Sequence, residues 1–332
     1  MLKIAMLSMA HVHANGYADH VVSHPEAQLK SIWDDDASRR KAAADRYGVP
    51  VYDDLDKLLS GDIDAVVIDA PTVQHPEVMK AAIKHGKHIF TEKALTVATK
   101  DADEIVQLVK SSGIKFMISL PSRTRPEILF MKDVLDKGLL GKITLMRARV
   151  AHSAALDKWF HDGSAWFADA AVAGGGALFD LGCHTTDIMR WFMGPPKSIM
   201  AKVQNFTNAY PIDDNTVAVI EFKNGALGIL DTAWVHRAGP NPYEIYGTDG
   251  YLGLNTAPGS GLVLSSTQSQ QSVPGYIYST ELPNALPMPM DQWISAILHN
   301  TPLSIGVEDG RNLTEMLEGI YKSANAGGSI SI

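Results

Sequence analysis

The chain contains a single cysteine, Cys183, among its 332 residues. One cysteine cannot form an intramolecular disulfide, and a metal site built from several cysteines is excluded as well. Long apolar runs are also missing. No stretch approaches the roughly 20 residues that a membrane-spanning helix needs, and the apolar run of residues 1–7 is too short for a signal peptide. We therefore expect a cytoplasmic protein with no membrane partner.

Positive charge is scarce relative to negative charge. The chain has 29 lysines and arginines against 37 aspartates and glutamates, for a net charge of −8. Nucleic acids and anionic membranes are bound through basic patches, so both are disfavoured as partners. The hydrophobic content of 45% and the charged content of 20% are ordinary globular values, which argues against disorder. The length suits two domains of roughly 100–200 residues each.

The order of predicted elements divides the chain near residue 120. Before that point, short apolar strands alternate with amphipathic helices that end in glycine, a pattern typical of parallel pairing with left-handed caps. Residues 196–266 instead read as strand after strand, with turns marked by asparagine or aspartate followed by glycine. The sequence predicts an α/β protein. A doubly wound, Rossmann-type dinucleotide-binding sheet is expected over residues 1–120, and an α+β domain with a largely antiparallel open sheet, for substrate binding and oligomerisation, over 121–332.

The turn after the first predicted strand is the first place to look for a ligand site. Ligands of doubly wound sheets bind beyond the carboxyl ends of the strands, where backbone N–H groups can approach a pyrophosphate. Here Ser8, Ala10 and His13 occupy the three glycine positions of G-x-G-x-x-G. Ser8 and Ala10 are small enough to allow that approach, whereas His13 is bulky. From this turn alone, a decayed ligand site is as well supported as a working one.

Three aspartates, residues 34–36, follow the second predicted strand. An acid here can accept a hydrogen bond from the adenosine ribose and repel a 2′-phosphate, so Asp34 favours NAD. Arg39 and Arg40 lie close enough to leave NADP open. An acidic cap on the following helix explains the same aspartates equally well.

His11 and His13 resemble a metal-binding pair. Their i, i+2 spacing lies in a strand-to-helix turn with no acidic ligand nearby in the sequence. We therefore predict no metal site.

A polar stripe is predicted on one helix of the second domain. Asp180, His184 and Asp187 stand at i, i+4 and i+7, which places them on one helical face. Histidine near its ordinary pKa is the best general base at neutral pH. A solvated surface is the simpler explanation of such a stripe, but Trp191 shares it and is awkward on a fully exposed face.

Two motifs resemble one family. Residues 64–93 combine a strand, the letters P-T-V-Q-H, a helix and G-K-H-I-F-T-E-K, and residues 174–187 read G-G-G-A-L-F-D-L-G-C-H-T-T-D. Both are similar to the Gfo/Idh/MocA oxidoreductases, the glucose–fructose oxidoreductase and inositol dehydrogenase family. Its patterns are P-x-x-x-H, G-K-H-V-x-x-E-K-P and G-G-G-x-x-x-D-x-G-x-H-x-x-D. The chain departs from them in the glycine turn and at Ala94, where the family has proline.

The resemblance implies an NAD(P)-dependent dehydrogenase or reductase acting on the CH–OH group of a sugar, inositol or related polyol. His184 matches the family's proton-transfer histidine, Asp180 the aspartate that orients it, and Lys93 the lysine that polarises the substrate oxygen. The residues expected at the cofactor are Ser8, Ala10, His11, His13, Asp34, Pro71, Thr72, His75, Glu92 and Lys93. The residues expected at the substrate are Arg123, Trp166, Asp169, Asp180 and His184.

Two other functions remain open. A relative that retains NAD could cleave glycosides or isomerise sugars without net redox, and a non-catalytic relative could act as a ligand sensor. The altered glycine turn leaves the sensor as an alternative, whereas the joint presence of Lys93, Asp180 and His184 argues against it. We also expect a homodimer or homotetramer formed through the second sheet, because its predicted strands carry apolar residues on both sides.

Overall fold

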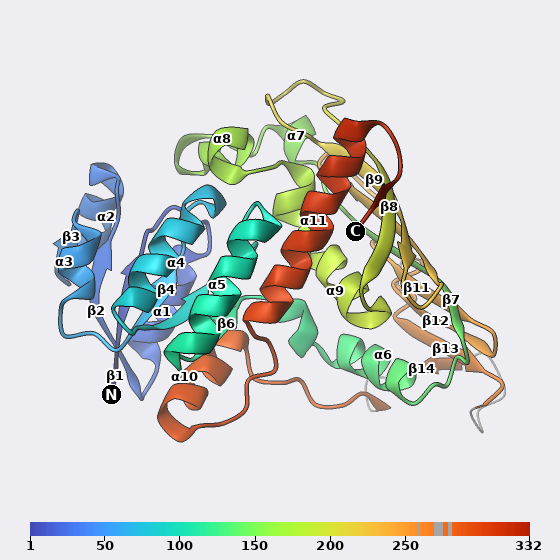
Figure 1. Ribbon diagram of the computed structural model, residues 1–332, viewed down its shortest axis with the longest axis horizontal. Helices are drawn as coiled ribbons and strands as arrows, with labels where there is room; N and C mark the ends of the chain where they lie inside the picture. The colour runs from blue at the N-terminus through green and yellow to red at the C-terminus, as the bar shows by residue number, and fades with distance from the viewer. Residues whose placement is uncertain (258, 269–274, 278–280) are drawn as a thin grey trace.

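The computed structural model describes residues 1–257, 259–268, 275–277 and 281–332. Within those residues the strands form two sheets, one of six strands and one of nine. Figure 1 shows the first sheet and its helices on one side of the molecule and the second sheet on the other, with the C-terminal helix between them. No helix in the described part of the chain is long and apolar enough to cross a membrane.

The first sheet is parallel throughout. Its strands are β1 (Leu2–Leu7), β2 (Ala27–Trp33), β3 (Val51–Tyr52), β4 (Ala65–Ile68), β5 (His88–Thr91) and β6 (Phe116–Ile118). The connecting segments are α1 (Ala14–Ser23), α2 (Ala37–Tyr47), α3 (Leu55–Leu59), the 3₁₀ turn η1 (Thr72–Gln74), α4 (His75–Lys84) and α5 (Thr99–Ser112). The order β3-β2-β1-β4-β5-β6 reverses between β1 and β4, where the carboxyl ends of the strands open a ligand crevice.

The second sheet is mostly antiparallel. Its strands are β7 (Ile143–Ala151), β8 (Pro196–Gln204), β9 (Asn215–Phe222), β10 (Leu227–Ala233), β11 (Tyr243–Gly247), β12 (Gly250–Leu254), β13 (Leu262–Ser266), β14 (Gly275–Ile277) and β15 (Ile330–Ser331). They are ordered β14-β13-β12-β11-β7-β10-β9-β8-β15, and β7 pairs with β10 in parallel. The predicted fold class, a doubly wound Rossmann-type sheet followed by a largely antiparallel one, is confirmed.

The remaining helices join the two sheets. They are η2 (Pro121–Thr124), α6 (Pro126–Asp136), α7 (Ala154–Asp157), η3 (Asp162–Ala168), α8 (Ala170–Ala173), the π-helical turn η4 (Leu178–Gly182), α9 (Cys183–Met193), α10 (Pro289–His299) and α11 (Val307–Ala326). Helix α11 packs against α5, α9 and β8, and therefore contacts both halves (Figure 1). Although α10 comes late in the chain, it packs on β5 and β6 of the first sheet.

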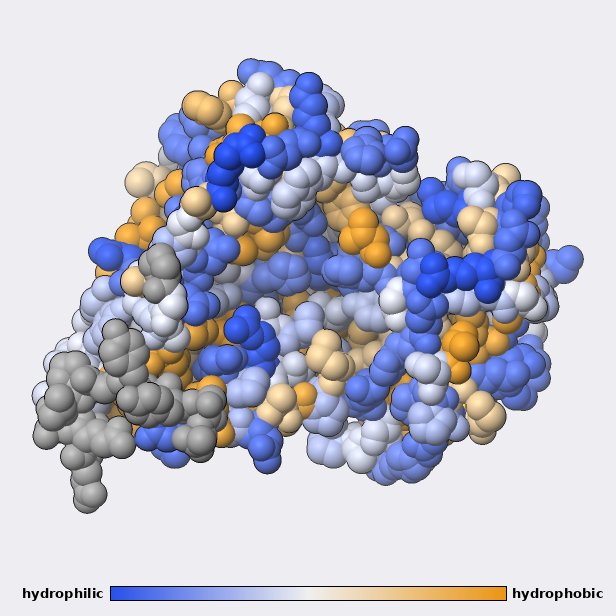
Figure 2. Space-filling model, turned by 180° about the vertical axis from the view of Figure 1, so that it is seen from behind, coloured by the Kyte–Doolittle hydropathy of each residue, from blue (hydrophilic) through white to orange (hydrophobic). Residues whose placement is uncertain are grey.

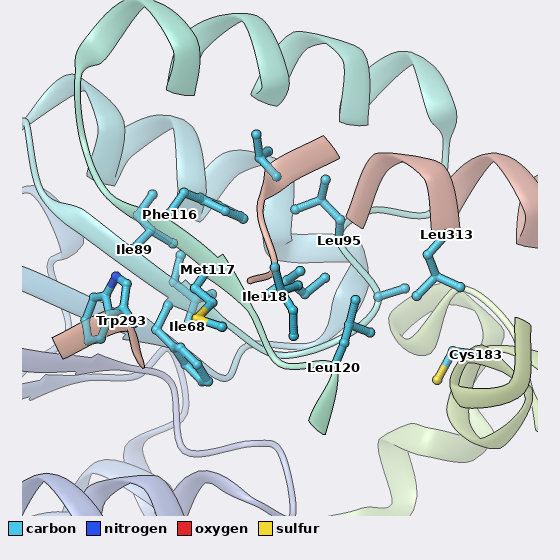
Figure 3. Close-up of a cluster of buried hydrophobic side chains, with 14 of the residues drawn as sticks. Ile68, Ile89, Leu95, Phe116, Met117, Ile118, Leu120, Cys183, Trp293 and Leu313 are labelled. Atoms are coloured by element: carbon cyan, nitrogen blue, oxygen red, sulfur yellow. The ribbon is translucent and has the colours of Figure 1, made fainter. Parts of the chain in front are cut away.

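Apolar packing is continuous between the first sheet and the C-terminal helices. Figure 3 shows side chains of β4, β5 and β6 meeting Trp293 of α10, with Leu313 of α11 close to Cys183 of α9. Trp293 lies 5.8 Å from the ring of Phe90, and both residues are fully buried. Burial of side chains this large contributes roughly 1.5–3 kcal/mol each. The packing holds the carboxyl edge of the first sheet beside α9, where the predicted catalytic residues lie.

Candidate active site at the edge of the parallel sheet

Lys93 and Asp180 link the two halves of the molecule. Lys93 comes two residues after β5, and its Nζ donates to the backbone carbonyl of Asp180 at 2.6 Å and lies 3.4 Å from that residue's Oδ1. Trp234 Nε1 donates to the other carboxylate oxygen at 3.2 Å. Burial disfavours the charged amine, but Cys183 and the carboxylates of Asp180 and Glu92 outweigh it and raise the pKa of Lys93. Lys93 is therefore a buried cation at neutral pH.

The start of the helical segment that carries Asp180 is held by Asp213. Its carboxylate accepts from the backbone N–H of Gly176 at 2.8 Å and from the hydroxyl of Tyr321 at 2.7 Å. A Cβ on Gly176 would lie only 2.0 Å from the Asp213 carbonyl oxygen. Only glycine fits this approach, which explains part of the glycine run.

His184 follows Asp180 on the same helical segment. Burial, followed by the charge of Lys93, lowers the pKa of His184 to about 4. The imidazole is therefore neutral at physiological pH and can accept a proton. The Asp180 carboxylate is engaged by Lys93 and Trp234, so it acts on His184 through its charge.

The rest of the predicted stripe is not a solvated surface. Asp187 is buried, and its two oxygens accept from Arg123 at 2.6 and 2.9 Å. Arg123 also donates to Asp309 at 2.6 Å and stacks on Trp191 at 4.9 Å. Because Arg123 donates to Asp187 of α9 and Asp309 of α11, it connects these two helices to the segment after β6. The substrate-binding role predicted for Arg123 stays a prediction, and the described contacts show this side chain bonded to Asp187 and Asp309.

Asp34 holds the turn after β1 through hydrogen bonds. Asp34 is fully buried, and its Oδ2 accepts from the Met9 N–H at 2.7 Å and from the Ser8 hydroxyl at 3.1 Å. Arg39 Nε lies 2.9 and 3.0 Å from the two oxygens, and these bonds lower the pKa of Asp34 although burial opposes them. Asp34 thus holds the turn in place, whereas Asp35 lines the adjoining cavity.

That cavity, of about 350 Å³, lies at the carboxyl ends of β2 and β4. Its lining residues are Asp35, Asp36, Arg39, Pro71, Gln74, Trp166 and Val172. Pro71 is therefore placed at the predicted cofactor side. The predicted substrate residue Trp166 lies there too, and its indole N–H donates to the Ala10 carbonyl at 2.9 Å.

Close packing fills the space between the β1 turn and Lys93. His11, Thr72, Lys93 and Asp180 line a cavity of only about 10 Å³. The stacked rings of Trp166 and Phe167, 4.0 Å apart, cover it.

Two further predicted residues support the backbone in this structure. His75 is buried, with its ring nitrogens 2.9 Å from the carbonyls of Ala94 and Ala70, so it pins the segment after Lys93 to the end of β4. The Lys93–Ala94 peptide is cis. Asp169 accepts from the Ala171 N–H at 2.9 Å and caps α8.

The sequence gives no sign of the contacts around Glu92. Its buried carboxylate accepts from the Tyr17 hydroxyl at 2.6 Å and lies 2.9 Å from His13 Nδ1 and 4.0 Å from His11 Nε2. Burial favours the neutral acid, but His11, His13 and Lys93 outweigh it and lower the pKa of Glu92. No acidic residue is close to the two histidines in the sequence, and it is the end of β5 that brings Glu92 to them.

Asp69 is another buried acid that the sequence analysis did not single out. It follows β4 directly, and among the described residues neither of its carboxylate oxygens has a hydrogen-bond partner. Burial, reinforced by the charge of Glu92, raises the pKa of Asp69 well above its ordinary value.

A larger cavity, of about 460 Å³, opens on the other side of His13. Its lining residues are Val12, His13, Gly16, Tyr17, His20, Phe90, Ser119, Pro121, Met288, Pro289 and Met290. Seen from the back, Figure 2 shows the molecular surface hollowed between the two lobes, with hydrophilic side chains in the hollow. The described surface therefore offers room for a ligand close to the predicted site.

The chain is similar in sequence to characterised dehydrogenases. The levoglucosan dehydrogenase of Pseudarthrobacter phenanthrenivorans is 27% identical over 223 residues, 58% of this chain and 56% of the relative. The scyllo-inositol 2-dehydrogenase (NAD(+)) of Bacillus subtilis is 27% identical over 247 residues, 71% of this chain and 68% of the relative. The chain thus spans little more than half the length of the first relative.

The fold is shared with solved structures. The WlbA dehydrogenase from Bordetella pertussis, in complex with NADH and UDP-GlcNAcA, superposes with a TM-score of 0.87 at 19% identity, covering 100% of this chain and 98% of that one. Family models described as "Oxidoreductase family, NAD-binding Rossmann fold" and "GFO/IDH/MocA C-terminal domain" match residues 8–120 and 128–253. This chain belongs to the Gfo/Idh/MocA family of oxidoreductases, and residues 8–120 match that family's NAD-binding Rossmann domain.

Proposed function

We propose that this chain transfers a hydride between NAD and the CH–OH carbon of a sugar, inositol or related polyol, with His184 as the proton-transfer residue. The observation that carries the proposal is the buried Lys93–Asp180 contact, which joins the edge of the parallel sheet to the helical segment of His184. The relatives named above, dehydrogenases of levoglucosan and of scyllo-inositol, support the substrate class.

The residues at the crevice suit a dinucleotide. Asp35 is half exposed at the 350 Å³ cavity and can accept from the adenosine ribose, with Pro71 beside it. The cavity of about 10 Å³ between His11 and Lys93 is too small for a nicotinamide ring. We therefore expect Trp166 to leave the Ala10 carbonyl when cofactor binds.

The chemistry divides among three side chains. Bound NAD supplies the hydride acceptor. His184, neutral at physiological pH, accepts the hydroxyl proton as the carbon is oxidised. The Lys93 ammonium lies where it can stabilise the substrate oxygen, and Asp180 holds that ammonium in position. For reduction of a carbonyl the same groups work in reverse.

The two halves have separate tasks in this proposal. Residues 1–120 bind the dinucleotide, and residues 121–332 bind the substrate and join protomers into a homodimer or homotetramer. On the second sheet, Met200, Val217, Val219 and Leu227 are large apolar side chains exposed on β8, β9 and β10. Covering them with a second protomer would remove apolar surface from water.

The test begins with calorimetric titration of NAD and NADP into the purified protein, followed by a screen of sugars and polyols at the nicotinamide absorbance band. His184→Ala should lower turnover by about 10²–10⁴-fold and leave NAD affinity nearly unchanged. The control is His299→Ala, since that half-exposed histidine pairs only with Glu26 in the described contacts, at 3.0 Å. Equal turnover in the two folded variants would contradict the assignment of His184.

A further inference from the structure

Three side chains that can bind a metal converge on the turn after β1. His11, His13 and Glu92 each offer one ligand atom, and these atoms all lie within 4.8 Å of one another. The shortest separation is 2.9 Å, between His13 Nδ1 and Glu92 Oε1, and His11 Nε2 lies 4.0 Å from Glu92 Oε2. The histidines come from the turn before α1 and the glutamate from the end of β5, so only the folded chain brings them together.

These separations suit a metal centre. Transition metals bind imidazole nitrogen and carboxylate oxygen at about 2.0–2.2 Å, which places neighbouring ligand atoms roughly 3–3.5 Å apart. The observed distances lie around that value, so small side-chain movements suffice. Two imidazoles and one carboxylate form the ligand set of catalytic zinc sites and of the two-histidine, one-carboxylate iron(II) sites. We propose that His11, His13 and Glu92 bind a divalent first-row transition-metal ion.

Hydrogen bonds position His11 and Glu92 in the cluster. The His13 N–H lies 3.2 Å from His11 Nδ1, so the other nitrogen of that ring, Nε2, faces Glu92. A metal at Nε2 moves the ring proton to Nδ1 and costs this one long hydrogen bond. The Tyr17 hydroxyl lies 2.6 Å from Glu92 Oε1 and 2.7 Å from the Ser119 hydroxyl, which orients the carboxylate.

Asp69 is a further buried acid next to the cluster. Among the described residues, both oxygens of this fully buried carboxyl are without a hydrogen-bond partner. Its backbone carbonyl accepts from the His11 N–H at 3.1 Å, and the Glu92 N–H bonds to Ile68, the residue before it. Asp69 thus lies between two of the three ligands.

The cluster is open to a ligand on one side. The side chain of His13 is 54% exposed and lines the cavity of about 460 Å³. Metal sites with three protein ligands and a free position are the ones that bind water or substrate. The proposed ion would have a free coordination position facing this cavity. Such a site is separate from the hydride chemistry proposed for Lys93, Asp180 and His184.

The test measures metal binding without using turnover. Chelator-treated full-length protein is titrated calorimetrically with Zn²⁺, and Co²⁺ is added in parallel to record its visible absorption bands. One equivalent should bind, and His11→Ala, His13→Ala and Glu92→Gln should each weaken Zn²⁺ affinity by at least about 10²-fold, because losing even an outer-shell partner costs 10–100-fold. The matched control is His299→Ala, which removes a half-exposed histidine that pairs with Glu26 away from the cluster.

Each outcome decides the proposal. Affinity unchanged in His13→Ala, the half-exposed ligand whose loss is least disruptive to folding, would overturn it. Absence of one-equivalent binding in the unsubstituted protein would overturn it as well, and would leave the cluster as a hydrogen-bond network that anchors Glu92. NAD titration of the same samples keeps this result separate from the proposed function: a protein that binds NAD but no metal refutes only the metal site.

Discussion

Replacing Arg123 with alanine tests whether this buried guanidinium holds the fold together or binds substrate. The Arg123 side chain is 5% exposed and makes hydrogen bonds of 2.6 and 2.9 Å to Asp187 and 2.6 Å to Asp309. The variant would leave the Asp187 carboxylate, itself buried, without its counter-ion. Breaking a buried ion pair from one side costs about 3–5 kcal/mol, because an uncompensated buried charge remains.

The size of the effect can be converted into a melting temperature. The unfolding entropy is about 2.1 cal/mol/K per residue, and the chain has 332 residues. If the two halves unfold together, a loss of about 4 kcal/mol in the free energy of unfolding lowers Tm by roughly 6 °C. Burial raises the pKa of Asp187 even beside Arg123. Without the arginine that pKa would rise further and the carboxyl would protonate more readily. The penalty should therefore shrink as the pH falls.

The assay is thermal unfolding of the variant with NAD titration of the same samples. Arg125→Ala is the matched control, since this neighbouring arginine is half exposed and its Nε forms a surface ion pair with Glu127 at 3.6 Å. Such a surface pair is worth about 0–1 kcal/mol. Arg123→Ala with Asp187→Asn should recover part of the lost stability. A variant that melts like the unsubstituted protein but loses substrate affinity would refute the structural role and restore the sequence-based assignment.

Three other predictions follow from the described contacts. NAD should bind more tightly than NADP, because Asp34 and Asp35 hold Arg39 and leave it less available for a 2′-phosphate. Asp35→Ala should raise the affinity for NADP relative to NAD by about 5–10-fold, and an unchanged ratio of the two calorimetric affinities would contradict this. The pKa of His184, about 4 in the folded chain against 6.5 ordinarily, means that the unfolded state takes up the proton first as the pH falls. This difference alone should lower stability by about 2–3 kcal/mol between about pH 7.5 and pH 4.5, and urea unfolding of His184→Gln should show a pH dependence that is smaller by this amount. Light scattering should find a dimer or tetramer that Val219→Glu dissociates, and a monomeric unsubstituted protein would rule out the sheet interface.

The sequence by itself determined the order of the elements and the two-sheet plan. Apolar runs alternating with amphipathic helices are local signals, and so are the glycines that end α2 and α5 with φ values of 64° and 72°. It also identified Lys93, Asp180 and His184, because each stands in a contiguous motif. Those residues do lie together at the edge of the sheet, although their catalytic roles are a proposal.

Only the tertiary structure decided what each polar side chain contacts. Arg123 has a sequence context that suits a ligand-binding arginine, yet its partners come from α9 and α11 and consume its donors. Asp34 stands at the position expected to bind the ribose, but its carboxylate accepts hydrogen bonds from Arg39 and from the turn after β1. The neighbouring Asp35 lines the cavity instead. Glu92 meets His11 and His13 because β5 and the β1 turn end at the same edge of a parallel sheet. Periodicity and composition report local backbone preference, whereas the pairing of buried charges depends on packing between segments far apart in the chain.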